Sequence, residues 1–236
     1  MKDYRILDRT LSGALSLPHP PVAVAFRPAP PPGVTKFDGR VPSGCSFWRL
    51  AGEGRVFYTE PADHYNCPVG SFTHNIPLPP ERAAELDQTL GLMMSIGYIK
   101  KEELGGIFRL RETPAVVIYA PLAESPVTPD VVVIAGRPGK LMLLQEAAIR
   151  AGLSAQPLLG RPTCMALPAS MTLGVVMSSG CIGNRVYTSI GEDELYVAIR
   201  GDRLERVAAE LPGVMLANSA LLEYHKDRRE TLTQVS

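Results

Sequence analysis

The sequence contains few cysteines, few aromatic residues and no excess of charge of either sign. Of its 236 residues, four are cysteine, one is tryptophan and 6% are aromatic. Lysine plus arginine number 24, as do aspartate plus glutamate, so the formal net charge is +0 at pH 7. A balanced chain has no overall field to attract nucleic acid, and it lacks the acidic surface that many ferredoxins carry. We therefore expect no nucleic-acid partner.

Long apolar runs are also missing. No stretch approaches the roughly 18 uninterrupted apolar residues by which a membrane span is recognised. Residues 1–9 lack the apolar segment of a secretory signal. We therefore expect a cytoplasmic protein with no membrane partner. Disulfides are rare in that reducing compartment, so the four thiols need another role: metal binding, catalysis or inert burial.

The rest of the composition is typical of a globular protein, with 45% hydrophobic and 20% charged residues. We expect a single compact α/β (mixed α+β) domain over residues 1–225, with a mixed sheet flanked by helices and a frayed polar tail over 226–236. An alternative organisation has two lobes divided by the helical region 80–98. Apolar spacing predicts helices over 3–17, 80–94, 140–151, 202–211 and 214–225, a short helix beginning near Cys45, and strands over 22–26, 55–59, 115–119, 131–135, 173–177 and 194–199.

The four cysteines lie next to glycine or proline, or two residues away in the case of Cys164, in segments typical of turns. Glycine next to a thiolate ligand lets the backbone turn sharply and approach a metal group without a Cβ clash. Four cysteines also match a complete Cys₄ set for a zinc ion or an iron–sulfur cluster. Against this, the chain has no Cys-x-x-Cys pair, and free cysteines often behave as small buried hydrophobes. The residues alone leave both interpretations open for Cys45, Cys67, Cys164 and Cys181.

Several neighbours of the cysteines are candidates for supporting roles. Trp48 would shield a cofactor from water or belong to the core, and Arg185 would balance an anionic cluster or be solvated. Gly180 and Gly183 flank Cys181 and would allow close backbone approach.

His64 has two further candidate roles. It would complete a Cys/His zinc site, or activate Cys67 as a nucleophile with Asp63 orienting its imidazole. Adjacent Asp63 and His64 side chains seldom point the same way, so the nucleophile hypothesis is the least favoured.

Six short motifs stand out along the chain. They are Cys45-Ser46-Phe47-Trp48, Asp63-His64-Tyr65-Asn66-Cys67-Pro68-Val69-Gly70, Tyr119-Ala120-Pro121-Leu122, Pro129-Asp130-Val131-Val132, Pro162-Thr163-Cys164 and Gly180-Cys181-Ile182-Gly183-Asn184-Arg185. Taken together, they resemble the domain of unknown function 169 family of archaea and bacteria. The resemblance covers about residues 8–215 and places all four cysteines on family motif positions, which implies a shared site. One departure is the segment 71–75, where we expect a small, apolar, glycine-containing continuation.

The preferred functional hypothesis is a cytoplasmic protein that binds one [4Fe–4S] cluster through the four cysteines. It would act in electron transfer or as a redox-enzyme component, with a redox partner protein or a small-molecule substrate. The alternative is a structural zinc (Cys₄) interaction module without catalysis. The sequence leaves open whether the protein is an enzyme. Apolar faces on the terminal helices would suit a homodimer.

Overall fold

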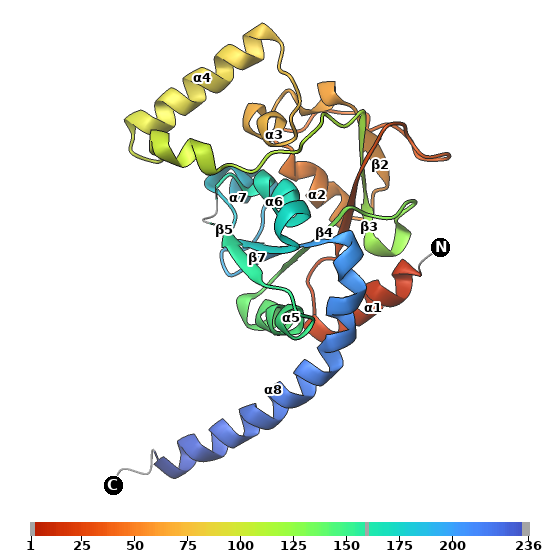
Figure 1. The fold of residues 1–236 in the computed structure, drawn as a ribbon, viewed down its shortest axis with the longest axis vertical. Coiled ribbons are helices and arrows are strands. Elements are labelled where there is room, and N and C mark those ends of the chain that lie inside the picture. Colours follow the sequence, from red (N-terminus) through yellow and green to blue (C-terminus); the bar gives the residue numbers. More distant parts are fainter. Residues whose placement is uncertain (1–2, 159–160, 233–236) are drawn as a thin grey trace.

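The computed structural model describes residues 3–158 and 161–232. These residues form one seven-stranded mixed sheet with the strand order β2-β3-β1-β4-β7-β6-β5 (Figure 1). Neighbouring strands are antiparallel except for β5 and β6, which are parallel. The strands are β1 (Val22–Arg27), β2 (Phe57–Thr59), β3 (Val116–Pro121), β4 (Val131–Gly136), β5 (Ala155–Leu158), β6 (Val175–Ser178) and β7 (Leu195–Arg200).

Helices cover both faces of this sheet (Figure 1). The helices α1, α5 and α8 pack together over one face, while α2 and α6 contact strands on the other. The α-helices are α1 (Tyr4–Leu15), α2 (Cys45–Gly52), α3 (Pro68–Thr73), α4 (Pro80–Ser95), α5 (Pro138–Arg150), α6 (Ala166–Leu173), α7 (Ile182–Thr188) and α8 (Leu204–Leu232); short 3₁₀ turns are η1 (Pro61–His64), η2 (Lys101–Gly106), η3 (Leu122–Glu124), η4 (Thr163–Met165) and η5 (Gly201–Arg203).

The central strand β4 shows why both faces are covered. Side chains alternate along a strand, so Val132 and Ile134 join the core beneath α1, α5 and α8. Val131 and Val133 point the other way, into the core beneath α2 and α6. All four are buried. The sequence predicted a strand over 131–135, and the structure confirms it; the continuous apolar run 131–135 is typical of a strand covered on both faces.

The prediction of the C-terminal secondary structure was wrong in two respects. A single helix, α8, replaces the two helices predicted over 202–211 and 214–225, and it continues through Pro212. Proline removes one helical hydrogen bond, but Leu211 and Val214 are buried on either side of it, and this packing keeps the helix continuous. Residues 226–232 are helical rather than frayed, while residues 233–236 lie outside the described part.

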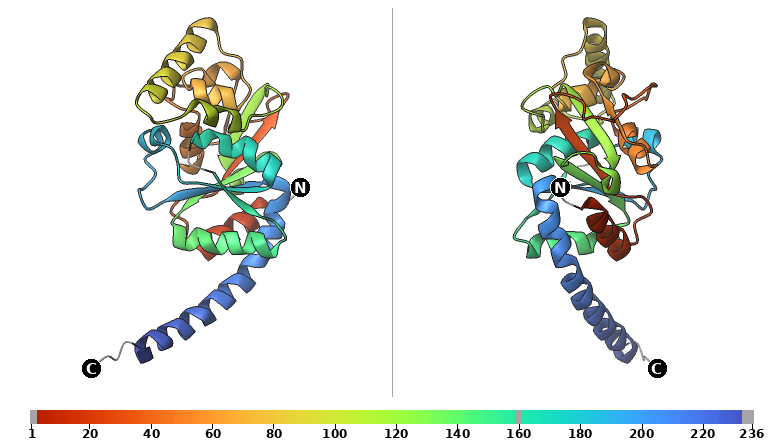
Figure 2. Two further views of the ribbon diagram at one scale, coloured as in Figure 1. Left: turned by 60° about the vertical axis from the view of Figure 1, so that its left-hand side comes forward. Right: turned by 90° about the vertical axis from the view of Figure 1, so that its right-hand side faces the viewer.

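The helical region 80–98 does not divide two lobes. Instead α4 and η2 form an arm at one end of a single domain, and no residue of either element is buried (Figures 1 and 2). At the opposite end the outer part of α8 leaves the domain and exposes Leu216, Leu221 and Leu222 (Figure 2). Across residues 3–158 and 161–232, no helix combines the length and apolar character that crossing a membrane requires.

Candidate metal centre

Each of the four cysteines lies where a helix begins. Cys45 is the first residue of α2, while Cys67 and Cys181 occupy the N-cap positions of α3 and α7. Cys164 lies in the 3₁₀ turn η4 that leads directly into α6. Backbone N–H groups are unpaired at a helix start, which makes these positions favourable for a negative sulfur. The sequence predicted such a helix only at Cys45.

The four thiols line one cavity, although long segments separate them in the sequence. The cavity has a volume of about 340 Å³. Contacts between α2 and α7 and between α3 and η4 bring the four helix starts together. Each thiol lies close enough to the other three for a charge on one to raise the pKa of another. Cys45 and Cys164 are buried, and Cys67 and Cys181 are half-buried.

Burial and the neighbouring thiols both oppose ionisation of Cys45, Cys67 and Cys164. Burial raises the pKa of Cys45 well above its usual range, and the neighbouring Cys164, Cys67 and Cys181 raise it further. Burial is also the main reason why the pKa values of Cys67 and Cys164 are raised. Thiolates gathered in this way require a compensating positive charge, because each one disfavours ionisation of the rest.

The backbone around Cys67 forms a tight cradle for its sulfur. The Gly70 N–H donates to Cys67 Sγ over 3.3 Å, and the Gly44 N–H also donates to this sulfur. Both donors stabilise the thiolate and lower its pKa against the effect of burial. A Cβ on Gly70 would lie 2.8 Å from Cys67 Sγ, well inside normal contact distance. Only glycine therefore leaves the sulfur in this position.

The loop that carries Cys181 has a comparable constraint. Gly180 has a φ of +78°, and a Cβ there would lie 2.8 Å from Asn184 Oδ1. The Asn184 amide hydrogen-bonds the Cys45 thiol and donates to Tyr196 Oη over 3.3 Å. Gly183 lines the cavity, but a Cβ there would make only an ordinary 3.6 Å contact with Tyr187. The backbone therefore requires glycine at 180 more than at 183.

Arg185 orders this loop instead of standing in solvent. Its guanidinium donates to the backbone carbonyls of Gly191, Ser179 and Glu194. These three acceptors lie on both sides of α7, so the side chain closes the loop around Cys181. The charge-balancing role expected of Arg185 stays a prediction.

The histidine is oriented differently from the sequence expectation. His64 Nε2 hydrogen-bonds Thr59 Oγ1 over 2.8 Å, and Asp63 accepts instead from the Glu60 N–H. Burial, followed by the nearby His74, lowers the pKa of His64 well below its usual range. Burial also lowers the pKa of His74 to about 4. Both imidazoles are therefore neutral at pH 7, and Thr59 rather than Asp63 orients His64.

Tyr119 is a site residue that the sequence reasoning did not single out. It is fully buried on β3, with Phe47 and Phe57 stacked on it at ring-centroid distances of 5.3 and 5.4 Å. Burial raises the pKa of Tyr119 well above its usual range, and the nearby Cys45 and Cys164 raise it further. Its hydroxyl has no hydrogen-bond partner in the described part of the chain. The hydroxyl is thus a buried donor near the thiols, although Tyr119 is not among the residues that line their cavity.

Within the described ranges 3–158 and 161–232, no three His, Cys, Asp or Glu side chains lie close enough together to hold a single metal ion. The four cysteines surround a space rather than meeting at one point. The only earlier signal for Tyr119 was its place in the motif that begins Tyr119-Ala120-Pro121.

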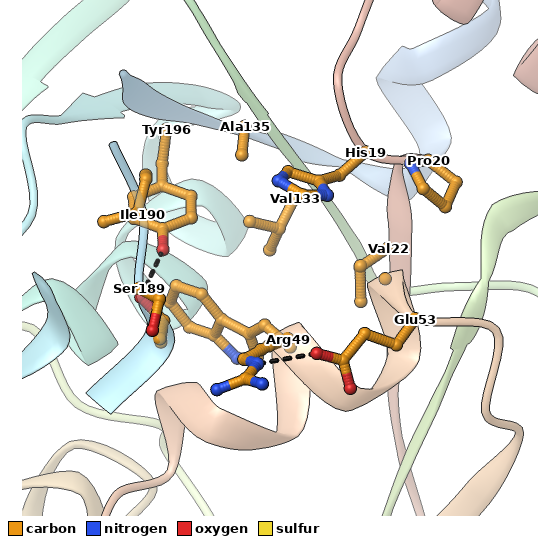
Figure 3. A pocket seen from close by; sticks show the side chains of 13 residues that line it. His19, Pro20, Val22, Arg49, Glu53, Val133, Ala135, Ser189, Ile190 and Tyr196 are labelled. Carbon is orange, nitrogen blue, oxygen red and sulfur yellow. Dashed lines mark hydrogen bonds and ion pairs between the residues drawn. The ribbon is translucent and has the colours of Figure 1, made fainter. Parts of the chain in front are cut away.

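Trp48 lies one helical turn beyond Cys45 but lines a second cavity, of about 260 Å³ (Figure 3). It is 3% exposed and packs edge-to-face on Tyr196, with 5.6 Å between ring centroids. An ion pair between Arg49 and Glu53 borders this cavity, opposite His19 (Figure 3). Trp48 is therefore a core residue that lines the second cavity and not the cysteine cavity.

In the metal-free protein, we expect iodoacetamide to alkylate Cys67 slowly at neutral pH and faster as the pH rises. The thiolate is the reactive form, and the pKa of Cys67 is raised, chiefly by burial. Alkylation monitored by peptide mass spectrometry should show a pH midpoint above that of the urea-unfolded chain, about 8.5. Steric protection alone would slow the reaction at every pH without moving the midpoint, so an unmoved midpoint would contradict this prediction.

The same shift connects thiol ionisation to stability. Because the folded-state pKa of Cys67 is raised, its protonated form stabilises the metal-free fold below the unfolded-state pKa. This contribution is lost as the pH rises through the folded-state value.

Comparison with known proteins identifies a family but no characterised relative. The family model DUF169, described as an uncharacterised ArCR, matches residues 10–210. No curated protein and no solved structure matches the chain. The matched range includes all four cysteines, Tyr119 and both cavities.

Proposed function

The chain belongs to the DUF169 family, and we propose that it binds one [4Fe–4S] cluster through Cys45, Cys67, Cys164 and Cys181. The proposal includes a role in electron transfer or as a component of a redox enzyme. The observation that carries it is the convergence of four thiols, from four different helix starts, on one cavity. A cluster of this kind supplies one-electron transfer when bound.

The surroundings of the thiols suit an anionic, sulfur-rich group. Backbone N–H groups of Gly70 and Gly44 donate to the Cys67 sulfur, and such donors stabilise thiolate ligands and tune the reduction potential. The Tyr119 hydroxyl, near Cys45 and Cys164, is a further buried donor with no partner among residues 3–158 and 161–232. Iron would also provide the positive charge that removes the mutual repulsion of the thiolates.

The size of the cavity favours a cluster over one zinc ion. Zinc holds four thiolates at about 2.3 Å from a single point, which leaves no space between the sulfurs. Here the cysteines line a cavity of about 340 Å³. A four-iron cluster takes each thiolate on a different iron and so spreads the four sulfurs apart. We therefore place the structural zinc alternative second.

Iron and acid-labile sulfide analysis of protein purified without oxygen tests the proposal. We expect about four iron and four sulfide per chain, with a broad absorption band near about 400 nm. The double variant Cys45→Ser/Cys181→Ser should lose both iron and sulfide, because it removes two ligands from opposite ends of the sequence. Wild-type protein purified in parallel is the control.

Two results would reject the proposal. Full iron and sulfide content in the double variant would show that the ligand set is wrong. One zinc per chain without sulfide would assign the site to the structural class, in a colourless protein stable in air.

A further inference from the structure

The arm formed by α4, η2 and their connection, residues 80–107, projects at one end of the domain and is here named the lid (Figures 1 and 2). Residues of this lid line one side of the cysteine cavity. The lid packs on the rest of the domain mainly through α3, the helix that Cys67 begins. No residue of α4 or η2 is buried. The lid is therefore folded without a core of its own.

One face of α4 is directed into the cavity. Glu85, Thr89 and Met93 line the cavity at intervals of one helical turn, and Leu90 lies beside them. The adjacent Leu92 and Met94 are outside the lining and are 60% and 39% exposed. The helix α4 therefore has one face toward the cavity and another toward solvent.

The cavity side of the lid is mostly apolar. The apolar lid residues that line the cavity are half-buried, so they face the cavity instead of completing a protein core. A ligand that covers this apolar surface removes it from water, and this burial favours binding. The apolar lid residues that line the cavity are Leu90, Met93, Tyr98, Ile99, Leu104 and Ile107.

The charged side chains that line the cavity all form ion pairs with neighbouring side chains. Among the described lining residues these are Glu85, Glu103 and Arg161. Glu85 pairs with Arg82, and Glu103 pairs with Arg161 over 3.1 Å. None of these three side chains is therefore an unpaired charge facing the cavity.

The two arginines of these ion pairs also attach the lid to the loops that carry the cysteines. The Arg161 guanidinium lies 4.7 Å above the Tyr98 ring, and Arg161 is three residues before Cys164. On the other side, Arg82 donates to the Asn66 side chain over 3.3 Å, directly before Cys67. The lid is thus held at a defined position relative to two of the thiols.

We propose that the space between the lid and the cysteines binds a small, uncharged, mainly apolar molecule. The whole cavity, of about 340 Å³, lies at the lower end of the range of small-molecule sites, roughly 300–1,000 Å³. This volume includes the space at the helix starts that the proposed cluster would occupy, so the molecule must be small and lie on the lid side. The apolar lid and the paired charges define the chemical class. Binding itself follows from this cavity, whereas a role of the molecule as a redox substrate rests on the proposed function.

Two matched fluorophores test this inference on the protein purified without oxygen. N-phenyl-1-naphthylamine is uncharged, and 1-anilinonaphthalene-8-sulfonate has the same ring system with a sulfonate added. Equilibrium dialysis, with the probe quantified after extraction, avoids quenching by a coloured cofactor. We expect one uncharged molecule per chain and at least a tenfold weaker affinity for the sulfonate. Met93→Glu should weaken binding of the uncharged probe at least tenfold, whereas Met94→Glu, on the solvent side of the same helix, should not.

The inference fails if the uncharged probe does not bind, if the sulfonate binds as tightly, or if Met93→Glu and Met94→Glu have equal effects. Circular dichroism of both variants verifies that the fold is retained. Iron and sulfide analysis of the same wild-type preparation reports on the proposed function separately. A preparation without iron and sulfide that still binds the uncharged probe would support this inference and reject the cluster.

Discussion

If the chain binds the proposed cluster, replacing Gly70 with alanine is expected to remove most of it while leaving the fold intact. The new Cβ would lie 2.8 Å from Cys67 Sγ and 3.4 Å from Cys67 Cβ. The sulfur ends a flexible side chain, so it will rotate away and leave the cavity before the backbone moves. Gly70 is inside α3, where alanine is tolerated and even stabilises the helix by up to about 1 kcal/mol.

The expected size of this effect follows from changes that misplace a metal ligand, which lower affinity by about 10- to 100-fold. Iron and sulfide content after anaerobic gel filtration, and the rate of iron loss to a chelator, measure it. Gly91→Ala is the matched control, because Gly91 is also in a helix and a Cβ there would meet nothing within 4 Å. A Gly70→Ala protein with full iron content and an unchanged spectrum would show that Cys67 is not a ligand.

Replacing Gly201 with alanine is expected to destabilise the whole domain. A Cβ at this position would lie 1.9 Å from the Pro129 carbonyl oxygen. The backbone at Pro129 and the backbone at Gly201 cannot easily move apart, because the Gly201 N–H donates to the Asp130 carbonyl over 2.7 Å. The Asp130 carboxylate in turn accepts from the Phe26 N–H over 2.7 Å. The substitution therefore separates β4 from β7 in the middle of the sheet or strains both.

Overpacking of this kind costs about 2–4 kcal/mol, at and above the upper end of the usual range. For a domain of this size the midpoint of thermal unfolding should fall by roughly 5–15 °C. Circular dichroism melting measures it, with Gly139→Ala in α5 as the control, because a Cβ there meets nothing within 4 Å. A Gly201→Ala midpoint within about 2 °C of wild type would contradict the prediction.

Local apolar patterns predicted much of the secondary structure. The helical spacing of Leu7, Leu11 and Leu15 predicted α1, and two of these leucines are fully buried. The strand β5 was missed because it lies at the edge of the sheet, contains Pro157 and has no buried residue. The short helices α3 and α7 were missed because six or seven residues carry too little periodicity to detect.

The candidate site also contains residues that the sequence identified and residues that only the structure identified. The four cysteines, Gly180 and Arg185 stood out because residue type and glycine neighbours are local properties. Tyr119 and Asn184 did not, because their importance arises from what surrounds them in space. The Tyr119 hydroxyl matters only because β3 places it beside buried thiols, and the lid matters only because α4 closes their cavity.

The sequence by itself determined which residues carry sulfur chemistry and which segments form the main helices and strands, since both depend on neighbours a few positions apart. The tertiary structure alone decided that β1 lies between β3 and β4, that α8 continues through Pro212, and that four separate helix starts meet at one cavity. These features depend on pairing and burial between segments far apart in the chain. Such long-range contacts leave no period in the sequence, because the free energy that selects them comes from packing.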